Sequence, residues 1–421
     1  PRNILVMVPA GDPVDAVLKT LAPRLSPGDL VIDGGNSHFP DTRRRHDEMA
    51  EKGLHFFGMG VSGGEEGARH GPSMMPGGPR EVYDRVAPIL EGMAAKVNGE
   101  PCVAHLGAGA SGHYVKMVHN GIEYGLMQLL AESYDLMRRG AGLGNDRMGD
   151  LYAEWNRGPL ASYLVEITAQ ILRQPEVVEV PPDETPGDEA PPEGVTGRYL
   201  LDFIKDTAKQ KGTGKWTSQD ALDLGVPTPT IDAAVTGRYV SALKDERVAA
   251  AALLGTPAGL ADDPERLVAS LERALRAAFL VTYAQGFALL KRASDAYEYG
   301  LDLGTVAKVW RGGCIIRADM LETFREAFRA DDDLPNLLVA PAFTEILVDC
   351  RAALRDAVRL GVGAGIPLPA FSASLAYLDA YRSEWLPANL VAAQRDYFGA
   401  HTFARIDKDG MFHAQWEPAG L

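Results

Sequence analysis

The stretch that decides the fold is SGHYVKMVHNGIEYGLMQLL, residues 111–130, which predicts the start of a long helix. At about 100° per residue, its polar and apolar residues fall on different sides. The polar side carries Lys116, His119, Asn120, Glu123 and Tyr124. A surface helix shows the same division, but its polar side usually repeats Glu, Lys and Arg, whereas this side offers a base, an acid and several hydrogen-bond donors. From this pattern alone, a catalytic face and an ordinary solvated face are equally good interpretations.

The residues before this helix alternate between predicted strands and predicted helices. Apolar runs predict buried strands at 4–8, 30–32 and 54–58, and the runs between them predict helices at 12–25 and 41–52. Crossover units of this kind build a doubly wound parallel sheet, which binds ligands at the carboxyl ends of its strands. We therefore expect a binding site where these strands end.

Two glycine-rich loops follow the second and third of these strands. Gly34-Gly35-Asn36 follows the second, and a loop at 59–65 that contains Ser62-Gly63-Gly64 follows the third. Paired glycines let backbone N–H groups approach an anionic or carbonyl oxygen closely, and Asn36 and Ser62 add side-chain hydrogen bonds. Tight turns without a ligand remain the alternative interpretation of the glycines alone.

The first strand starts almost at Pro1, and no GxGxxG dinucleotide fingerprint follows it. That fingerprint belongs to the first βαβ unit of a dinucleotide-binding domain. We therefore expect the chain to begin inside such a domain, with about two units of about 30 residues each before it. A cofactor has to be predicted from other residues.

From about residue 110 onwards the predicted structure is almost entirely helical. Helices are predicted at 148–155, 162–172 and 200–208, and Asp263 with Pro264 caps a further long helix. Residues 211–217 form a glycine-rich basic turn before a helix. Such a turn is typical of a phosphate cradle, although the GxxxxGK spacing of a Walker motif is absent.

Two later segments lack a strong helical pattern. Residues 175–194 carry six prolines, seven acidic residues and no basic residue, which predicts a solvated, mobile loop. Residues 384–421 predict a tail that either frays or docks, and its aromatic residues favour docking on a second subunit. We have no functional interpretation of the acidic segment.

Composition narrows the possible partners. The chain has 421 residues and a formal net charge of −15, which argues against nucleic acid or an anionic membrane as the main partner. An anionic substrate would need locally placed Lys and Arg. The three cysteines, Cys102, Cys314 and Cys350, show no CxxC spacing, so we expect buried free thiols and no metal site. With no membrane-spanning apolar run and no signal peptide, we expect a cytoplasmic protein.

Seven separated motifs, taken together and in order, resemble those of the decarboxylating 6-phosphogluconate dehydrogenase family. They are DGGNS at 33–37, the glycine-rich run at 60–78, the helix that carries Lys116, KGTGKWT at 211–217, LKDER at 243–247, WRGGCIIR at 310–317 and QRDYFGAH at 394–401. The resemblance spans nearly the whole chain. It implies an incomplete Rossmann-like doubly wound parallel sheet in 1–109, a large all-helical domain in 110–383, and a C-terminal tail in 384–421 that reaches the partner subunit of a homodimer.

The resemblance also implies a reaction. The substrate would be 6-phosphogluconate, the oxidant NADP, and the products ribulose 5-phosphate and CO2, as in the pentose phosphate pathway. Lys116 would take the proton of the C3 hydroxyl as hydride leaves C3, and would then stabilise the oxyanion that forms on decarboxylation. Glu123, two turns along the same face, would return a proton to C1 of the enediol.

The binding residues follow from the same resemblance. The substrate would be held by Asn36, Ser62, Gly63, Gly64, His119, Asn120, Tyr124, Lys211 and Arg238, and by Arg395 and His401 of the partner subunit. The cofactor would be held by Val8, Pro9, Ala10, Asn36, Val61 and Glu65. Family members commonly show Val-Lys-Ala-Gly where this chain has Val-Pro-Ala-Gly at 8–11, which removes one cationic contact with the cofactor.

Two alternatives are open. A related β-hydroxyacid dehydrogenase acting on a smaller acid would share the Gly-Gly loop and the helix lysine. Lys211, Arg238 and the tail residues Arg395 and His401 argue against it, because an unphosphorylated acid needs no such cluster. The second alternative is a binding protein without catalytic activity, which the absence of the GxGxxG fingerprint suggests.

Overall fold

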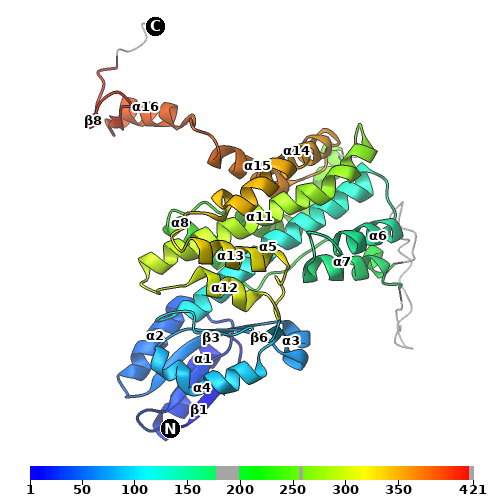
Figure 1. Ribbon diagram of the computed structural model, residues 1–421. Helices are drawn as coiled ribbons and strands as arrows, with labels where there is room; N and C mark the ends of the chain where they lie inside the picture. The colour runs from blue at the N-terminus through cyan, green and yellow to red at the C-terminus, as the bar shows by residue number, and fades with distance from the viewer. Residues whose placement is uncertain (177–198, 256–258, 417–421) are drawn as a thin grey trace. The chain divides into compact units, whose positions relative to one another are not determined.

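The structure is a computed structural model that describes residues 1–176, 199–255 and 259–416. The chain divides into two compact units, Pro1–Leu375 and Ala376–Leu421. Most of the acidic, proline-rich segment at 175–194 lies outside the described residues. Within the first unit, the N-terminal part contains the main sheet and the rest is helical (Figure 1).

Three parallel strands form most of the sheet, whose order is β1-β2-β3-β4. The strands β1 (Asn3–Val6), β2 (Leu30–Asp33) and β3 (His55–Ser62) place Asn3 opposite Leu30, and Leu30 opposite His55. The crossovers are α1 (Asp12–Leu21) with a short 3-10 turn, η1 (Ala22–Arg24), and α2 (Phe39–Ala50). The predicted doubly wound parallel sheet is therefore confirmed.

The predicted loop at 59–65 is wrong except at Gly63, because 59–62 belong to β3 and 64–65 to a helix. β3 continues to Ser62, because its last four residues pair antiparallel with β4 (Ser73–Pro76), with Met59 opposite Pro76 and Ser62 opposite Ser73. The helix α3 (Gly64–His70) joins these strands, and α4 (Arg80–Met93) follows. The Met-Met-Pro sequence of β4 lies between turn residues, so its pairing partner could not be read from local pattern.

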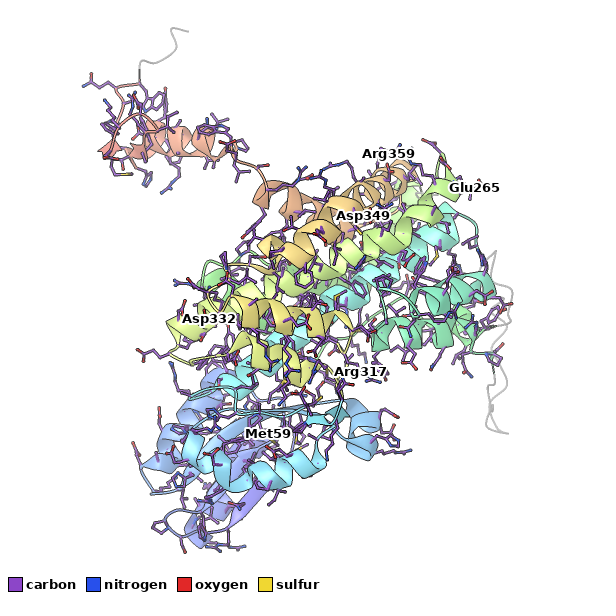
Figure 2. All side chains as sticks on the ribbon, in the orientation of Figure 1. Met59, Glu265, Arg317, Asp332, Asp349 and Arg359 are labelled. Atoms are coloured by element: carbon purple, nitrogen blue, oxygen red, sulfur yellow. The ribbon has the colours of Figure 1, made fainter. Side chains whose placement is uncertain are left out.

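The sheet buries apolar side chains on both faces, as a parallel sheet must. On one face, Leu30, Ile32 and Met59 join Leu90 of α4. On the other face, Val31 and Phe56 pack with apolar residues of α1 and α2. Met59 is labelled in this sheet-containing part (Figure 2). Burial of each of these side chains contributes about 2 kcal/mol.

The long helix α5 (Ser111–Asp135) links the sheet to the helical part of the unit. Three of its glycines allow close approach. A Cβ on Gly112 would lie 2.4 Å from the Gly58 carbonyl of β3, one on Gly121 would lie 2.6 Å from Thr217, and one on Gly125 would lie 2.5 Å from Thr282. The helix is therefore enclosed on most sides, and its polar face is buried except at Glu123, which is partly exposed.

The helical part is built around α5 and α11 (Pro264–Ala296), and α11 packs against both α5 and α14 (Pro341–Gly363) (Figure 1). The side chain of Asp263 accepts the N–H of Arg266, which confirms the predicted cap. The other helices are α6 (Asn145–Trp155), α7 (Tyr163–Arg173), α8 (Thr213–Asp223), α9 (Pro229–Ala242), α10 (Lys244–Leu254), α12 (Leu303–Trp310), α13 (Met320–Ala330) and α15 (Pro369–Tyr381). Short elements are β5 (Lys96–Val97), β6 (Glu100–Pro101), the π-helical turn η2 (Leu136–Gly140), and the 3-10 turns η3 (Leu200–Phe203) and η4 (Leu337–Val339).

The helix predicted at 200–208 is wrong. Only the short turn η3 (Leu200–Phe203) forms, and the following residues run as exposed, irregular chain. Contacts from α9 and α10 fix this segment, because Asp206 pairs with Lys244 and Arg247, and the N–H of Ala208 donates to Ser241. These tertiary contacts outweigh the local helical pattern.

The second unit contains an ordered small motif. It consists of α16 (Ala388–Gly399) and a two-stranded hairpin, β7 (Phe403–Ala404) with β8 (Met411–Phe412). Elsewhere, Cys102, Cys314 and Cys350 are free and buried, which confirms the expectation for the thiols. Among the described residues, no helix is both long enough and apolar enough to cross a bilayer.

A buried carboxylate ties α5 to the start of α15. Glu132 accepts the backbone N–H groups of Ala370 and Phe371 and the side-chain amide of Gln128. Burial raises the pKa of Glu132 to about 7, although the three hydrogen bonds oppose this shift. The folded protein therefore binds a proton that the unfolded chain releases between its ordinary pKa and about pH 7.

We expect this group to make stability depend on pH. Because the pKa is raised in the folded state, the contribution of Glu132 is largest at low pH and is lost as the pH rises towards 7. In Glu132→Gln this dependence should vanish. The difference in unfolding free energy between the unaltered protein and Glu132→Gln should change by about 1.4 kcal/mol per pH unit between pH 5 and 7. Urea unfolding across this range measures it, and parallel profiles would contradict the assignment.

Candidate active site

The amine of Lys116 is buried where α5 crosses the end of β3. Its Nζ atom donates to Ser62 Oγ at 3.1 Å and to Asn120 Oδ1 at 2.7 Å. A third and longer contact joins Nζ to His119 Nδ1 at 3.4 Å. Burial lowers the pKa of Lys116, because the charged ammonium loses its hydration, while nearby Glu123 opposes the shift. The site therefore favours a neutral amine.

His119 and Glu123 continue the polar face. His119 lies behind Lys116, with its Nε2 atom 3.3 Å from Ser62 Oγ, and burial moves its pKa well below the usual value, so it is neutral. Glu123 lies 3.8 Å from His119 Nδ1, and burial raises the pKa of its carboxyl while the Lys116 charge opposes that shift. The base and the acid of this face are thus both shifted towards their neutral forms.

Glycines in β3 let α5 approach the strand closely. A Cβ on Gly60 would lie 2.3 Å from the Cβ of Lys116, and a Cβ on Gly58 would lie 2.4 Å from the His113 ring. The His113 ring in turn hydrogen-bonds Thr42 of α2 at 2.7 Å. The place of Lys116 is therefore fixed by the packing of α5 against the glycines of β3, in addition to the hydrogen bonds of its amine.

A buried arginine holds together the two loops that follow β1 and β2. Arg45 of α2 donates to both carboxylate oxygens of Asp15 and to the carbonyl of Gly11, and its guanidinium lies 3.7 Å from Asp33. Asp33 in turn accepts the N–H of Gly35. The residue next to this anchored glycine, Asn36, is exposed and faces the cleft described below.

Two cationic side chains, Lys211 and Arg238, line the site near Tyr124 of α5. The guanidinium of Arg238 stacks 4.2 Å from the centre of the Tyr124 ring and donates to the carbonyl of Lys209. A Cβ on Gly214 would lie 2.6 Å from the Tyr124 ring, so this glycine makes room for it. Lys211 is exposed beside them. This end of the site suits a phosphate dianion.

These groups face a single cleft of about 1380 Å³. Its lining includes the predicted residues Val8, Pro9, Ala10, Asn36, Val61, Ser62, Gly63, Gly64, Lys116, Asn120, Glu123, Tyr124, Lys211 and Arg238. His119 lies just behind the wall and contacts the cleft through Lys116 and Ser62. Glu65 is not among the lining residues, and its exposed side chain pairs with Arg69 on α3.

The two remaining predicted residues, Arg395 and His401, belong to the second unit. Both side chains are exposed, Arg395 on α16 and His401 directly after it. His401 lies 6.0 Å from the Phe398 ring, edge to face. Within the described residues, no group of His, Cys, Asp and Glu has the arrangement of a metal site.

Sequence reasoning missed part of the cleft wall. Methionines supply much of its apolar surface, and Arg69, Lys209 and Trp216 add polar and aromatic contacts. The methionines are Met7, Met59, Met74, Met93 and Met127. Arg69 and Trp216 lie inside motifs that were recognised, but the methionines come from five separate elements and no local pattern connects them.

The fold and the cleft define a class of protein. Glycine-rich loops at the carboxyl ends of a parallel sheet are typical of a nucleotide-binding oxidoreductase domain, and the buried lysine with a protonatable glutamate adds acid–base chemistry from a helical domain. Family models agree with this class. Residues 2–107 match the NAD binding domain of 6-phosphogluconate dehydrogenase, and residues 112–416 match the 6-phosphogluconate dehydrogenase C-terminal domain.

Individual relatives agree over the whole chain. The 6-phosphogluconate dehydrogenase (decarboxylating) of Lactococcus lactis is 52% identical, covering 99% of this chain and 85% of the relative. The NADP(+)-dependent, decarboxylating enzyme of Bacillus subtilis is 50% identical, covering 99% and 86%. A solved structure of Plasmodium falciparum 6-phosphogluconate dehydrogenase superimposes with a TM-score of 0.91 at 41% identity, covering 99% and 86%. The chain belongs to the 6-phosphogluconate dehydrogenase family.

We expect the Gly60 contact to be sensitive to a single methyl group. Gly60→Ala should lower the unfolding free energy by about 1–3 kcal/mol, because α5 or β3 must shift. Gly92→Ala is the matched control, since nothing lies within 4 Å of the Cβ position there. Denaturant unfolding of both variants measures the difference. Equal stability of the two variants would show that α5 does not rest on β3 as described.

Proposed function

We propose that this chain catalyses the oxidative decarboxylation of 6-phosphogluconate to ribulose 5-phosphate and CO2, with NADP as the oxidant. The observation that carries the proposal is the buried Lys116 amine, with a lowered pKa, two helical turns from a glutamate with a raised pKa in the same cleft. Seven residues of helix span about 10 Å, so a six-carbon chain laid along α5 reaches both groups.

The residues present at the carboxyl ends of β1 to β3 fit a nicotinamide cofactor. The cleft wall there combines glycine-rich backbone with apolar side chains, and beside Gly64 nothing lies within 4 Å of the Cβ position. Val8, Pro9, Ala10, Asn36 and Val61 would hold the cofactor. When bound, NADP supplies the acceptor for the hydride that leaves C3. Glu65 lies outside the lining, so its side chain is not part of this proposal.

In the first step Lys116 acts as the base. Its neutral amine takes the proton of the C3 hydroxyl as hydride leaves C3 for the nicotinamide, and loss of both turns the alcohol into a 3-keto acid. Ser62 and Asn120 accept the two N–H groups of the neutral amine and keep the lysine side chain in place, so that its lone pair takes the substrate proton. Asn36, Ser62, Gly63, Gly64, His119 and Asn120 would hold the carboxylate and hydroxyl groups.

In the second step the cationic Lys116 stabilises the product of decarboxylation. The C1 carboxylate leaves as CO2, its bonding electrons move onto the C3 oxygen, and the Lys116 ammonium gives this oxygen a proton to form an enediol. In the third step Glu123 donates a proton to C1 of this enediol, which was C2 of the substrate, and the hydroxyl proton of the neighbouring carbon returns to Lys116, which leaves the ketone of ribulose 5-phosphate. The raised pKa of Glu123 keeps a larger share of the carboxyl protonated near neutral pH, as a general acid requires.

The phosphate would be bound at the other end of the cleft. Tyr124, Lys211 and Arg238 lie together there, and Arg238 is held in place by the Tyr124 ring and the Lys209 carbonyl. Arg395 and His401 would complete this site from the second unit of a partner subunit in a homodimer. The exposed apolar side chains of that unit, among them Leu390, Phe398 and Met411, support docking on another subunit.

Two further assignments belong to this proposal. The protein would act in the cytoplasm, which its three free thiols support. Residues 1–109 would form the cofactor domain, 110–383 the substrate and dimerisation domain, and 384–421 the tail that reaches the partner.

The direct test is an assay that follows nicotinamide reduction and CO2 release with 6-phosphogluconate. We expect Lys116→Ala to abolish reduction, because no base remains, while substrate binding measured by calorimetry stays detectable. Lys52→Ala is the control, because Lys52 is exposed at the end of α2. Unchanged turnover in Lys116→Ala would eliminate the mechanism.

We expect kcat/KM to depend on pH in a bell shape. Activity should fall at acidic pH, because the Lys116 amine becomes protonated, and at alkaline pH, because Glu123 loses its proton. The pKa shifts of the two groups, downward for Lys116 and upward for Glu123, bring both ionisations closer to neutrality. In Glu123→Gln the residual activity should be lower by about 100-fold and lose its alkaline decline. A persisting decline would assign that ionisation to another group.

Subunit mixing tests whether the tail acts in the partner's site. Lys116→Ala and Arg395→Ala chains, each impaired alone, should regain activity when they are unfolded together and refolded. About a quarter of all sites would then be intact, if dimers form at random. Lys116→Ala mixed with Glu123→Gln is the control, because both changes lie on α5 and no intact site can form. Failure to regain activity in the first mixture would place Arg395 in its own subunit's site.

A further inference from the structure

The segment 385–416, all of which the structure describes, has almost no buried side chains of its own. Asp396 is the one buried residue in it, and apolar side chains such as Leu390, Phe398 and Ile406 are exposed. An apolar core therefore does not determine how α16 and the following hairpin are arranged. Ring contacts of Trp416 with Tyr397 and Phe403 contribute, and polar contacts supply the rest.

The carboxylate of Asp396 supplies these contacts. It accepts the N–H of Thr402 at 3.0 Å, His413 Nδ1 at 2.9 Å, the N–H of Ala414 at 3.0 Å and Trp416 Nε1 at 2.9 Å. Burial alone would raise the pKa of Asp396, but these four hydrogen bonds hold it at about 2, so the group is ionised at neutral pH. One charged group thus ties α16 to the chain after it and to the end of the hairpin.

His401 lies inside the turn that this carboxylate closes. Ala400 and Thr402 on either side of it have φ values of 50° and 63°, in the left-handed region that non-glycine residues seldom adopt. The N–H of Ala400 donates to the carbonyl of Asp396, and that of Thr402 to its carboxylate. A Cβ on Gly399 would lie 2.7 Å from the His401 ring, so a bare glycine is needed to seat the ring.

We propose that Asp396 is a positioning residue that holds Arg395 and His401 as a preassembled pair for the substrate phosphate. The inference rests on the proposed function, which assigns these two side chains to the phosphate of 6-phosphogluconate. Arg395 precedes Asp396 on α16, and His401 is fixed by the turn that Asp396 closes. A turn and helix already in place bind more tightly, because less of the chain has to be ordered at the moment of binding.

Asparagine is the informative substitution at this position. It has the shape of aspartate, but its NH2 group would face at least one of the four donors that now point at an oxygen. Asp396→Asn should therefore release the turn that carries His401. Asp407→Asn is the matched control, because Asp407 lies in the same unit and loses the same charge, yet it is exposed and, within the part of the chain that the structure describes, forms its ion pair with Arg405.

The test compares kinetic constants of the full-length variants. Asp396→Asn should raise the KM for 6-phosphogluconate by about 10- to 100-fold, the range expected when hydrogen bonds to a charged group are lost. The KM for NADP and the control Asp407→Asn should stay within about twofold of the unaltered protein. An unchanged KM for 6-phosphogluconate in Asp396→Asn would overturn the proposal.

A combined variant separates positioning from a general loss of structure. In the Arg395→Ala/His401→Ala background, Asp396→Asn should have no further effect on the KM for 6-phosphogluconate, because the side chains it positions are gone. An equal further rise in KM in this background would show a general structural role and overturn the inference. If Arg395→Ala/His401→Ala itself leaves this KM unchanged, the assignment of the phosphate site fails instead.

A second variant covers the case in which Asp396→Asn does not fold. Gly399→Ala leaves all four hydrogen bonds of Asp396 intact but places a methyl group against the His401 ring. It should raise the KM for 6-phosphogluconate about as much as His401→Ala does. A KM equal to that of the unaltered protein would show that the ring does not need the position the turn gives it.

Discussion

The removal of the Lys116 amine from water is the constraint on which the rest of the site depends. An ammonium group in water stays charged up to about pH 10 and cannot act as a base near neutrality. Here α5 lies so close to β3 that a Cβ at Gly60 would force one of them to shift, and the polar partners of the amine within the described residues are Ser62, Asn120 and His119. None of these partners is a carboxylate, so nothing in direct contact restores the charge that burial disfavours.

The same burial acts on the acid of the site in the opposite sense. Glu123 is set back two turns from Lys116, far enough to avoid a direct ion pair, and its pKa rises as that of Lys116 falls. A contact ion pair would have locked both groups in their charged forms. Separation along one helix instead lets each group change its protonation state once during a reaction cycle.

The long helix α5 and the loop at Gly34-Gly35-Asn36 could be predicted because their signals are local. The spacing of Lys116, His119 and Glu123 is set within two turns, and the turn residues of Gly34-Gly35-Asn36 follow directly on a strand. The burial of the polar face could not be predicted, because it comes from distant partners such as Thr217, against which Gly121 packs.

Contacts between distant residues also explain the two errors in the predicted secondary structure. β4 exists only through its pairing with β3, and the chain after Leu200 is held by α9 and α10 and not by its own helical preference.

The most direct test of the account is the ionisation of Lys116 itself. NMR titration of the protein with 13C-labelled lysine, with Lys116→Arg used to assign the resonance, reports the pKa of this one amine. The account predicts a pKa well below that of the exposed lysines, because the amine is buried without a contacting carboxylate. A Lys116 resonance that titrates together with the exposed lysines, near pH ~10.4, would contradict it.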